Sequence, residues 1–164
     1  MKYSPKTVRC SLTTPLGPMT LAADDTALVW AGFDGQKHEP ETGGWPQSPA
    51  HPVLRLARAQ LQQYFASGRR AFDIPLDLGS GTVFQQSVWQ SLMGIAPGTT
   101  CSYGTISQRI GRPKAVRAVG AAIGRNPISI IVPCHRVVGA NGTLTGYAGG
   151  LDRKLALLQM ESSL

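Results

Sequence analysis

The chain has 164 residues, of which 42% are hydrophobic and 15% charged, a composition typical of a globular protein with one domain or two small ones. No apolar run approaches the roughly 18 uninterrupted residues of a membrane span, and the N-terminus lacks the apolar core of a secretory signal, so the sequence predicts a cytoplasmic protein with no membrane partner. The net charge of +7 is concentrated in residues 81–164, which carry eight Lys/Arg and two Asp/Glu and suit either a polyanion such as nucleic acid or a solvated basic surface.

Residues 11–33 are typical of short strands, because apolar runs alternate with turn signals made of Pro, Gly and Asp. They predict a hairpin or a small antiparallel sheet. The Gly- and Pro-rich residues 35–52 come next and predict an exposed loop in which His38 and His51 are solvated.

A helix is predicted over residues 53–67 and ended by Gly68. Its apolar face is formed by Leu54, Ala57, Leu61, Tyr64 and Phe65. Residues 72–78 predict one more strand, and Gly79–Gly81 a linker. The chain is thereby divided into an N-terminal domain, 1–78, the linker, 79–81, and a C-terminal domain, 82–164.

Helical periodicity begins after Thr82, a candidate N-cap for a helix over residues 83–95. A short helix over 105–110, a break at Gly111–Pro113 and a second helix that ends near Gly124 form a helix-turn-helix pattern. The second helix carries mostly Ala, Val and Gly, which favours contacts with the shape and phosphates of nucleic acid over base-specific reading.

Residues 128–132 predict a short buried strand, 139–150 a glycine-rich loop, and 151–161 a closing helix with Asp152 in its first turn. The three cysteines include no C-x-x-C pair, and Cys10, His38 and His51 form no recognisable ligand set. The sequence therefore predicts neither a disulfide framework nor a metal site.

Cys134 comes directly after the predicted strand and is the candidate nucleophile. Pro133 cannot donate to a sheet, so the strand ends there and the next residues are exposed. His135 and Arg136 bring two potential cations within a turn of the thiol, a setting that stabilises a thiolate, and Glu161 is suited to hold His135 in one tautomer. The alternative is an inert core cysteine. Because neighbours in a strand point to opposite faces, Cys134 and His135 need a helical turn or a bridging water to act together.

Several short motifs occur in one order and spacing over residues 82–161. They are "VWQSL", "SYGTIS", "IGRPKAVRAVG", "NPISIIV", "PCHRV", "GYAGG" and "RKLALLQME". In these motifs the chain resembles the methylated-DNA–protein-cysteine methyltransferases, also called O6-alkylguanine-DNA alkyltransferases, and "TPLGPMTLAA" fits the smaller N-terminal domain of that family more loosely. The resemblance implies an α/β (α+β) fold, with a small antiparallel-sheet, RNase H-like N-terminal domain and a C-terminal winged helix-turn-helix domain that carries the active site.

The resemblance also implies a role for each matching residue. Cys134 takes the alkyl group from guanine O6 as a thioether, after His135 has removed the thiol proton through a water and Glu161 has oriented the imidazole. Tyr103 gives a proton to the minor-groove edge of the leaving guanine, and Asn126 braces the turn before the active-site segment.

Further residues are implied in the contact with DNA and in the pocket. Arg117 fills the gap left by the extruded nucleotide, and the other DNA contacts come from Ser102, Tyr103, Lys114, Ala115 and Gly120. The pocket for the base and the alkyl group is lined by Ile123, Val137, Tyr147 and Ala148. Ser129 lies at a nearby position that varies in the family, which puts tolerance of bulky alkyl groups in question.

The function so implied is a DNA repair protein, monomeric and free of cofactors, that reacts once with alkylated double-stranded DNA. Whether O4-alkylthymine is accepted, and whether copies cluster along DNA, stay open. The first alternative is a sensor that binds alkylated bases without reacting, although such relatives lack the cysteine. The second is a Cys-His hydrolase, for which the sequence offers no oxyanion-hole signature.

Overall fold

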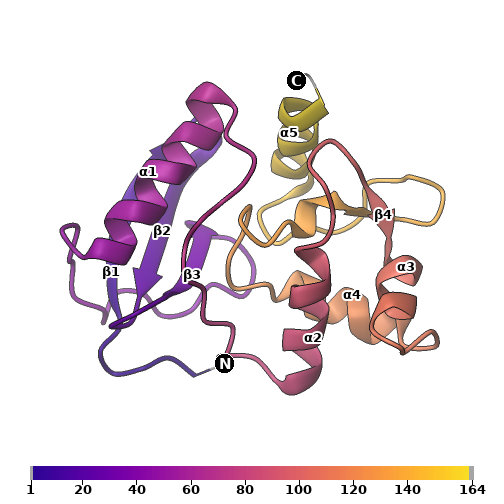
Figure 1. The fold of residues 1–164 in the computed structure, drawn as a ribbon, viewed down its shortest axis with the longest axis horizontal. Helices are drawn as coiled ribbons and strands as arrows, with labels where there is room; N and C mark the ends of the chain where they lie inside the picture. The colour runs from indigo at the N-terminus through magenta and orange to yellow at the C-terminus, as the bar shows by residue number, and fades with distance from the viewer. Residues whose placement is uncertain (1, 163–164) are drawn as a thin grey trace.

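The computed structural model describes residues 2–162, which form two lobes side by side (Figure 1). The N-terminal lobe contains strands β1 (Val8–Thr14), β2 (Gly17–Ala23) and β3 (Leu28–Phe33) and helix α1 (Pro52–Ser67). The C-terminal lobe contains α2 (Val83–Leu92), β4 (Cys101–Ser102), α3 (Tyr103–Arg109), α4 (Val116–Gly124), the 3₁₀ helix η1 (Cys134–Arg136), β5 (Val137–Val138) and α5 (Leu151–Ser162).

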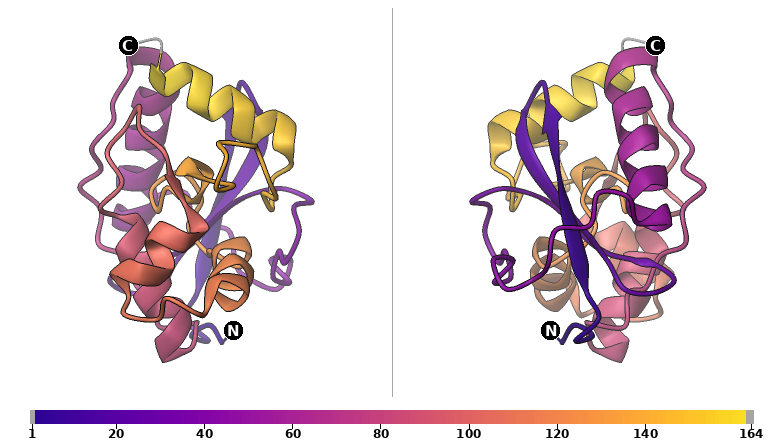
Figure 2. Two further views of the ribbon diagram at one scale, coloured as in Figure 1. Left: turned by 90° about the vertical axis from the view of Figure 1, so that its right-hand side faces the viewer. Right: turned by 90° about the vertical axis from the view of Figure 1, so that its left-hand side faces the viewer.

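The N-terminal lobe is a three-stranded antiparallel sheet in the order β1-β2-β3, with α1 packed against one face (Figure 2). This confirms the predicted small sheet and the helix after it. The predicted apolar face of α1 is buried except for Phe65, which is half-buried. Gly68 ends the helix in the left-handed region, at φ 79°, where a residue without a side chain is favoured.

Residues 72–78 do not form the predicted regular strand. Their exposure alternates with the period of a strand, but only Leu76 pairs, in an isolated parallel bridge to Leu28 at the edge of β3. The amide of Leu28 donates to Pro75 and that of Asp77 to Leu28, over 2.8 and 2.9 Å. Pro75 lacks the N–H that would extend this ladder on the N-terminal side of the bridge.

The C-terminal lobe begins with the predicted cap. The Thr82 hydroxyl accepts from the amide of Gln85, and the Gln85 side chain accepts from the amide of Thr82, which together form a capping box. Helices α3 and α4 come next and form the predicted helix-turn-helix. Strands β4 and β5 add a two-stranded parallel ribbon.

Residues 128–132 are buried as predicted but form a tight loop instead of a strand. Ile130 has a positive φ of 74°, which a β-branched residue rarely adopts and which interrupts an extended chain. The amide of Val132 donates back to the carbonyl of Ile128 over 3.0 Å. Ile128 itself bridges to Ala31 at the same edge of β3 that meets Leu76, so the loop joins the two lobes.

A continuous cluster of buried apolar residues runs from the sheet and α1 through α2 and α4 to Leu157 of α5. The helix α5 lies over the junction of the lobes, with its C-terminal end beside the end of α1 (Figures 1 and 2). The mixed fold confirms the predicted class. The exact division at residues 79–81 stays a prediction.

Candidate active site

Cys134, His135 and Arg136 form one turn of 3₁₀ helix, η1, directly after the tight loop. Their exposed fractions are 6%, 0% and 5%, so all three are buried, and the exposure expected after Pro133 is wrong. A 3₁₀ helix has three residues per turn, and it therefore turns neighbouring side chains by about 120° instead of placing them on opposite faces. This is the helical turn that the sequence requires if Cys134 and His135 are to act together.

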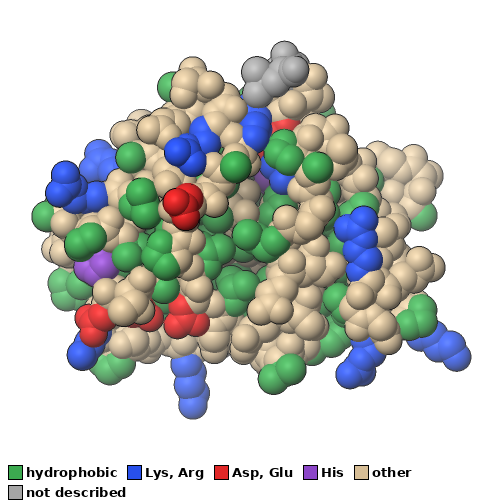
Figure 3. Space-filling model, in the orientation of Figure 1, with side chains coloured by type: hydrophobic (Ala, Val, Ile, Leu, Met, Phe, Trp, Pro, Cys, Tyr) green, Lys and Arg blue, Asp and Glu red, His purple; other side chains and the backbone are tan. Residues whose placement is uncertain are grey.

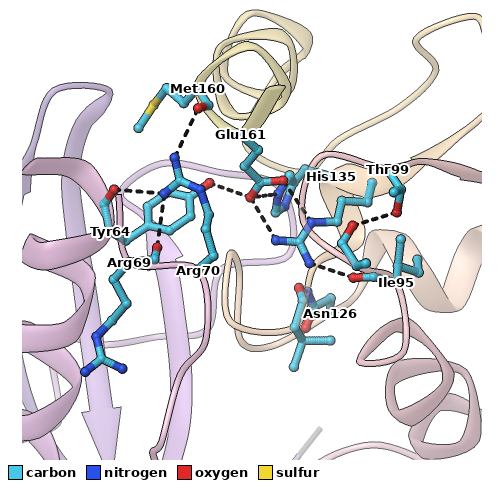
Figure 4. A network of polar contacts seen from close by, with 12 residues as sticks. Tyr64, Arg69, Arg70, Ile95, Thr99, Asn126, His135, Met160 and Glu161 are labelled. Carbon is cyan, nitrogen blue, oxygen red and sulfur yellow. Dashed lines mark hydrogen bonds and ion pairs between the residues drawn. The ribbon is translucent and has the colours of Figure 1, made fainter. Parts of the chain in front are cut away.

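Glu161, on the last turn of α5, is the centre of a buried hydrogen-bond network (Figure 4). Its Oε2 lies 2.8 Å from Nε2 of His135 and accepts from Nη2 of Arg136 over 2.9 Å, while Oε1 accepts from Nε of Arg136 over 2.8 Å. Arg136 also donates to the carbonyl of Ile95 over 2.7 Å. The predicted contact between His135 and Glu161 is thus present in the structure.

The protonation states of this pair depend on their surroundings. Burial alone would raise the pKa of Glu161, but hydrogen bonds from His135 and Arg136 hold that pKa well below its usual range, so the carboxylate is ionised and only accepts. Burial lowers the pKa of His135 more strongly than Glu161 raises it. The neutral imidazole therefore carries its proton on Nε2, toward Glu161, and keeps a lone pair on Nδ1. Within residues 2–162 that buried Nδ1 has no hydrogen-bond partner.

The setting of Cys134 differs from the expected one. Burial raises the pKa of the thiol, and a hydrogen bond from Asn126 and the charge of Lys154 only partly oppose this. The guanidinium of Arg136 is engaged by Glu161 and His135 is neutral, so neither supplies the expected cation. The resting group is a thiol, which needs a base to become a nucleophile.

Asn126 lies at the end of α4 and holds the tight loop from inside. Its Nδ2 donates to the carbonyl of Val132 over 2.8 Å, and its Oδ1 accepts from the amide of Ile128 over 3.0 Å. The side chain is 4% exposed. It thereby connects both ends of the loop that leads into η1, as expected for a residue that braces this turn.

A cavity of about 210 Å³ opens beside this site. Its lining comes from four parts of the chain: Lys37, His38, Tyr103, Gly120, Ile123, Gly124, Gly146, Tyr147 and Ala148. The Tyr147 hydroxyl is buried. Its pKa is raised mainly by burial and also by the nearby Cys134, so the thiol lies near this part of the lining. Val137 is fully buried in β5 and is not among the lining residues.

The predicted DNA contacts gather on the helix-turn-helix. Ser102 caps α3 by accepting from the amide of Thr105 over 3.1 Å, and Ala115 occupies the N-cap position of α4. Lys114 and Arg117 are exposed, as are Arg109, Arg112 and Arg125. Lys and Arg side chains project from the surface over α3 and α4 (Figure 3), and the sequence has no acidic residue between Asp77 and Asp152.

Four polar residues of the site were missed by sequence reasoning. Lys154 is fully buried on α5 and donates to the carbonyl of Thr145 over 2.6 Å, and Tyr64 of α1 donates to Glu161 over 2.7 Å. Lys37 and His38 are exposed, as expected for a loop, but they stand at the rim of the cavity. The one available signal in the sequence was the position of Lys154 on the apolar face of the closing helix, which indicates a buried lysine. His51 is not simply solvated, because its Nδ1 caps α1 by accepting from the amide of Val53.

Cys10, Cys101 and Cys134 are free thiols. Within residues 2–162 no group of three His, Cys, Asp or Glu side chains is placed to hold a metal ion. No helix in the same range combines the length and apolar character of a membrane-spanning segment.

These features define a class of protein: a basic helix-turn-helix unit that carries a buried Cys-His-Glu set beside a small cavity. Two family profiles match the chain. Residues 8–78 match the ribonuclease-like domain of 6-O-methylguanine DNA methyltransferase, and residues 83–163 match the DNA-binding domain of the same family.

Individual relatives agree with these profiles. The methylated-DNA–protein-cysteine methyltransferase of Mycobacterium leprae is 50% identical over 151 residues, which span 92% of this chain and 90% of the relative. The crystal structure of the Mycobacterium tuberculosis O6-methylguanine methyltransferase superposes with a TM-score of 0.87 at 48% identity, covering 96% of this chain and 93% of the other. A structure of the M. tuberculosis protein in complex with DNA superposes with a TM-score of 0.86 at 48% identity, covering 93% and 91%.

The chain belongs to the family of methylated-DNA–protein-cysteine methyltransferases. It is accordingly a DNA-binding methyltransferase of DNA repair.

Proposed function

We propose that the protein extrudes an O6-alkylguanine from double-stranded DNA and transfers the alkyl group irreversibly to Cys134. The observation that carries this proposal is the buried series of Glu161, neutral His135 and the Cys134 thiol, which we call the proton relay, beside a cavity lined by Tyr103 and Tyr147. A buried thiol that must be deprotonated on demand suits a protein that reacts only when its substrate is in place.

In the first step the thiol loses its proton to Nδ1 of His135. This nitrogen is buried and without a partner in the described chain, so a water between it and Sγ of Cys134 would satisfy both groups and carry the proton. Glu161 stabilises the imidazolium that results, and Asn126 and Lys154 stabilise the thiolate.

In the second step Sγ of Cys134 forms a bond to the alkyl carbon, and the bond from that carbon to guanine O6 breaks with its electron pair. The leaving guanine is neutralised by a proton from Tyr103, because a neutral base leaves more readily than an anion. Thr145 donates to the Tyr103 hydroxyl over 3.1 Å, which leaves the proton of Tyr103 free to be given away. Tyr103 then takes up a proton from solvent and the His135 imidazolium returns one to it. In net terms the alkyl group has replaced the thiol proton, and the guanine, which remains in the DNA, has gained one proton.

Extrusion of the nucleotide is required because a stacked base hides its O6 substituent, and Cys134 is only 6% exposed. Arg117 would fill the vacated stack, a role supported by its exposure on the first turn of α4. Ser102, Lys114, Ala115 and Gly120 lie on the same helix-turn-helix, and a relative at 48% identity has been solved with DNA. Ile123 and Ala148, which also line the cavity, would then face the base.

The transfer inactivates the protein irreversibly, because nothing in the described site offers a route to cleave a thioether. Each molecule of the protein therefore repairs one lesion. It does so without a cofactor, as a monomer in the cytoplasm. The relay and the cavity are both built from one chain, so neither needs a second copy for completion.

The test is an intact mass and a peptide map after incubation with a duplex that contains O6-methylguanine. We expect a stable gain of one CH₂ on the peptide that contains Cys134, at most one per molecule. Cys134→Ser should show no gain, whereas Cys101→Ser, a matched change at a half-buried cysteine on β4, should react as the wild type does. Binding of the duplex without any gain of mass would overturn the proposal in favour of a non-reacting sensor.

A further inference from the structure

One side chain of the N-terminal lobe reaches into the proton relay. Tyr64 lies near the end of α1 and is 1% exposed, and its hydroxyl donates to Oε2 of Glu161 over 2.7 Å. The same oxygen lies 2.8 Å from Nε2 of His135. Figure 4 shows the two lobes meeting at this carboxylate, with Tyr64 on one side and His135 on the other.

The position of the Tyr64 ring is fixed by its neighbours. The guanidinium of Arg70 stacks 4.7 Å from the ring centroid, and the rings of Phe65 and Phe72 lie 5.2 and 5.8 Å away. Arg70 also donates to the carbonyl of Tyr64 over 3.2 Å and to that of Met160 over 3.0 Å. The residue that precedes Glu161 is thereby tied to the same arginine that holds Tyr64.

We propose that Tyr64 is a positioning residue for the transfer reaction, which acts through Glu161 to set the basicity of His135. This inference rests on the proposed function, in which His135 takes the proton of Cys134. It assigns to the N-terminal lobe a direct part in the chemistry, in addition to packing.

The physical reason lies in the number of donors on one oxygen. Oε2 of Glu161 accepts from Tyr64, His135 and Nη2 of Arg136, so each donor competes for the same negative charge. Burial and the charge of Glu161 raise the pKa of Tyr64, so the phenol keeps its proton and remains a donor. Without this donor the carboxylate would attract the proton on Nε2 more strongly and make His135 more basic.

The charged groups that act on His135 lie on η1 and α5. Glu161 on α5 raises the pKa of His135, whereas burial, Arg136 on η1 and Lys154 on α5 lower it. Tyr64 on α1 acts on this balance through Glu161 alone. A protonated imidazole has no lone pair on Nδ1, so the rate of transfer falls as the pH decreases through the pKa of His135.

The experiment is the pH profile of the single-turnover rate for Tyr64→Phe, which keeps the ring and its packing and removes only the hydroxyl. We expect the acid-side midpoint to move upward by roughly 0.5 to 1 pH unit, with a several-fold loss of rate below the midpoint and less than about a twofold change above it. An unchanged midpoint would overturn the proposal.

Two control variants separate the hydrogen bond from general packing. Tyr3→Phe removes a buried hydroxyl from the same lobe, at a site remote from Glu161, and should leave the midpoint in place. Arg153→Lys on α5 keeps the charge but weakens the bond to the carbonyl of Leu16 in the N-terminal lobe, so it should lower the melting temperature without moving the midpoint. A shift in Arg153→Lys equal to that in Tyr64→Phe would assign the effect to the docking of the lobes and contradict the proposal.

Two further measurements keep the test decisive. NMR titration of His135 in the DNA-free protein reports the same shift of the midpoint without any transfer reaction. If the wild type fails to alkylate Cys134, the proposed function is refuted, and the titration still tests the role of Tyr64. If Tyr64→Phe does not fold, 3-fluorotyrosine at position 64 preserves the packing and donates more strongly. It should move the midpoint of His135 downward, and an upward or absent shift would refute the proposal.

Discussion

At the scale of single residues, the site depends on one ionised carboxylate in the protein interior. Glu161 is 5% exposed and accepts four hydrogen bonds, from Tyr64, His135 and the two donor nitrogens of Arg136. A buried charge is tolerated only when it is paired and its lone pairs are satisfied. Arg136, itself 5% exposed, depends on the same pairing.

Glu161→Gln keeps the shape of the side chain but removes its charge. It leaves the Arg136 guanidinium buried without a counter-ion and points an amide N–H₂ group at other donors. We expect the free energy of unfolding in urea to fall by about 3–5 kcal/mol, the cost typical of removing one partner from a buried pair. Asp152→Asn, an equivalent change at the exposed first turn of α5, should stay within about 0.5 kcal/mol of the wild type. A loss below about 1 kcal/mol in Glu161→Gln would contradict this account of the pair.

At the scale of secondary-structure elements, α4 contributes both to the core and to the cavity. Val119, Ala122 and Ile123 are buried in the core, Ile123 also lines the cavity, and Gly120 lines it beside Tyr103. A Cβ atom built on Gly120 lies 3.7 Å from the Tyr103 ring, which is an ordinary van der Waals contact. The glycine is therefore not needed for the packing of the helix itself.

This geometry predicts that stability and transfer respond differently to the size of residue 120. Gly120→Ala should stabilise the protein by up to about 1 kcal/mol, because alanine favours the helix and its methyl group fits. Gly120→Leu should fold but fill the space beside Tyr103, so the transfer rate should fall by at least about tenfold, the effect of 1.4 kcal/mol on the barrier. The check is the melting temperature and the single-turnover rate of both Gly120 variants. A wild-type rate for Gly120→Leu would show that the base does not enter the cavity beside Gly120.

At the scale of the whole molecule, the exposed cations and part of the cavity lining lie on the same helix-turn-helix of the C-terminal lobe. The exposed cations over α3 and α4 have no acidic residue near them in the sequence, whereas the N-terminal lobe mixes both signs (Figure 3). Cations of this kind bind DNA through its phosphates, which gives an affinity that depends on salt and has little sequence preference.

Affinity for duplex DNA should therefore decrease steeply as salt increases, with little dependence on sequence. Lys114→Ala should weaken binding uniformly across sequences and reduce the slope of log affinity against log salt by about one. Lys6→Ala, an exposed lysine of the N-terminal lobe whose side chain is 72% accessible, should leave the slope unchanged. Equal slopes for Lys114→Ala and the wild type would show that Lys114 does not contact the phosphates of DNA.

Much of the fold could be read from local signals. The Thr82 cap, the Gly68 stop and the two short helices around Gly111–Pro113 are each confirmed, because caps, breaks and apolar periodicity depend on residues within a few positions of one another. The position of Cys134 after a proline and before His135 was evident for the same reason.

The predicted strand over residues 128–132 shows where local reading ends. Alternation and burial cannot reveal that Ile130 has a positive φ, that Asn126 binds both ends of the loop, or that Ile128 pairs with Ala31 in the other lobe. These arrangements depend on hydrogen bonds between segments that are distant along the chain.

The sequence by itself determined the helices, the basic half and the identity of the thiol, since these depend on residue type and short-range spacing. Only the tertiary structure decided the protonation of the site. It buries Cys134 as a thiol, leaves Nδ1 of His135 without a partner in the described part of the chain and brings Tyr64, 97 positions away, onto Glu161. Burial and long-range contacts set the pKa of a side chain, and neither is encoded in its neighbours along the chain.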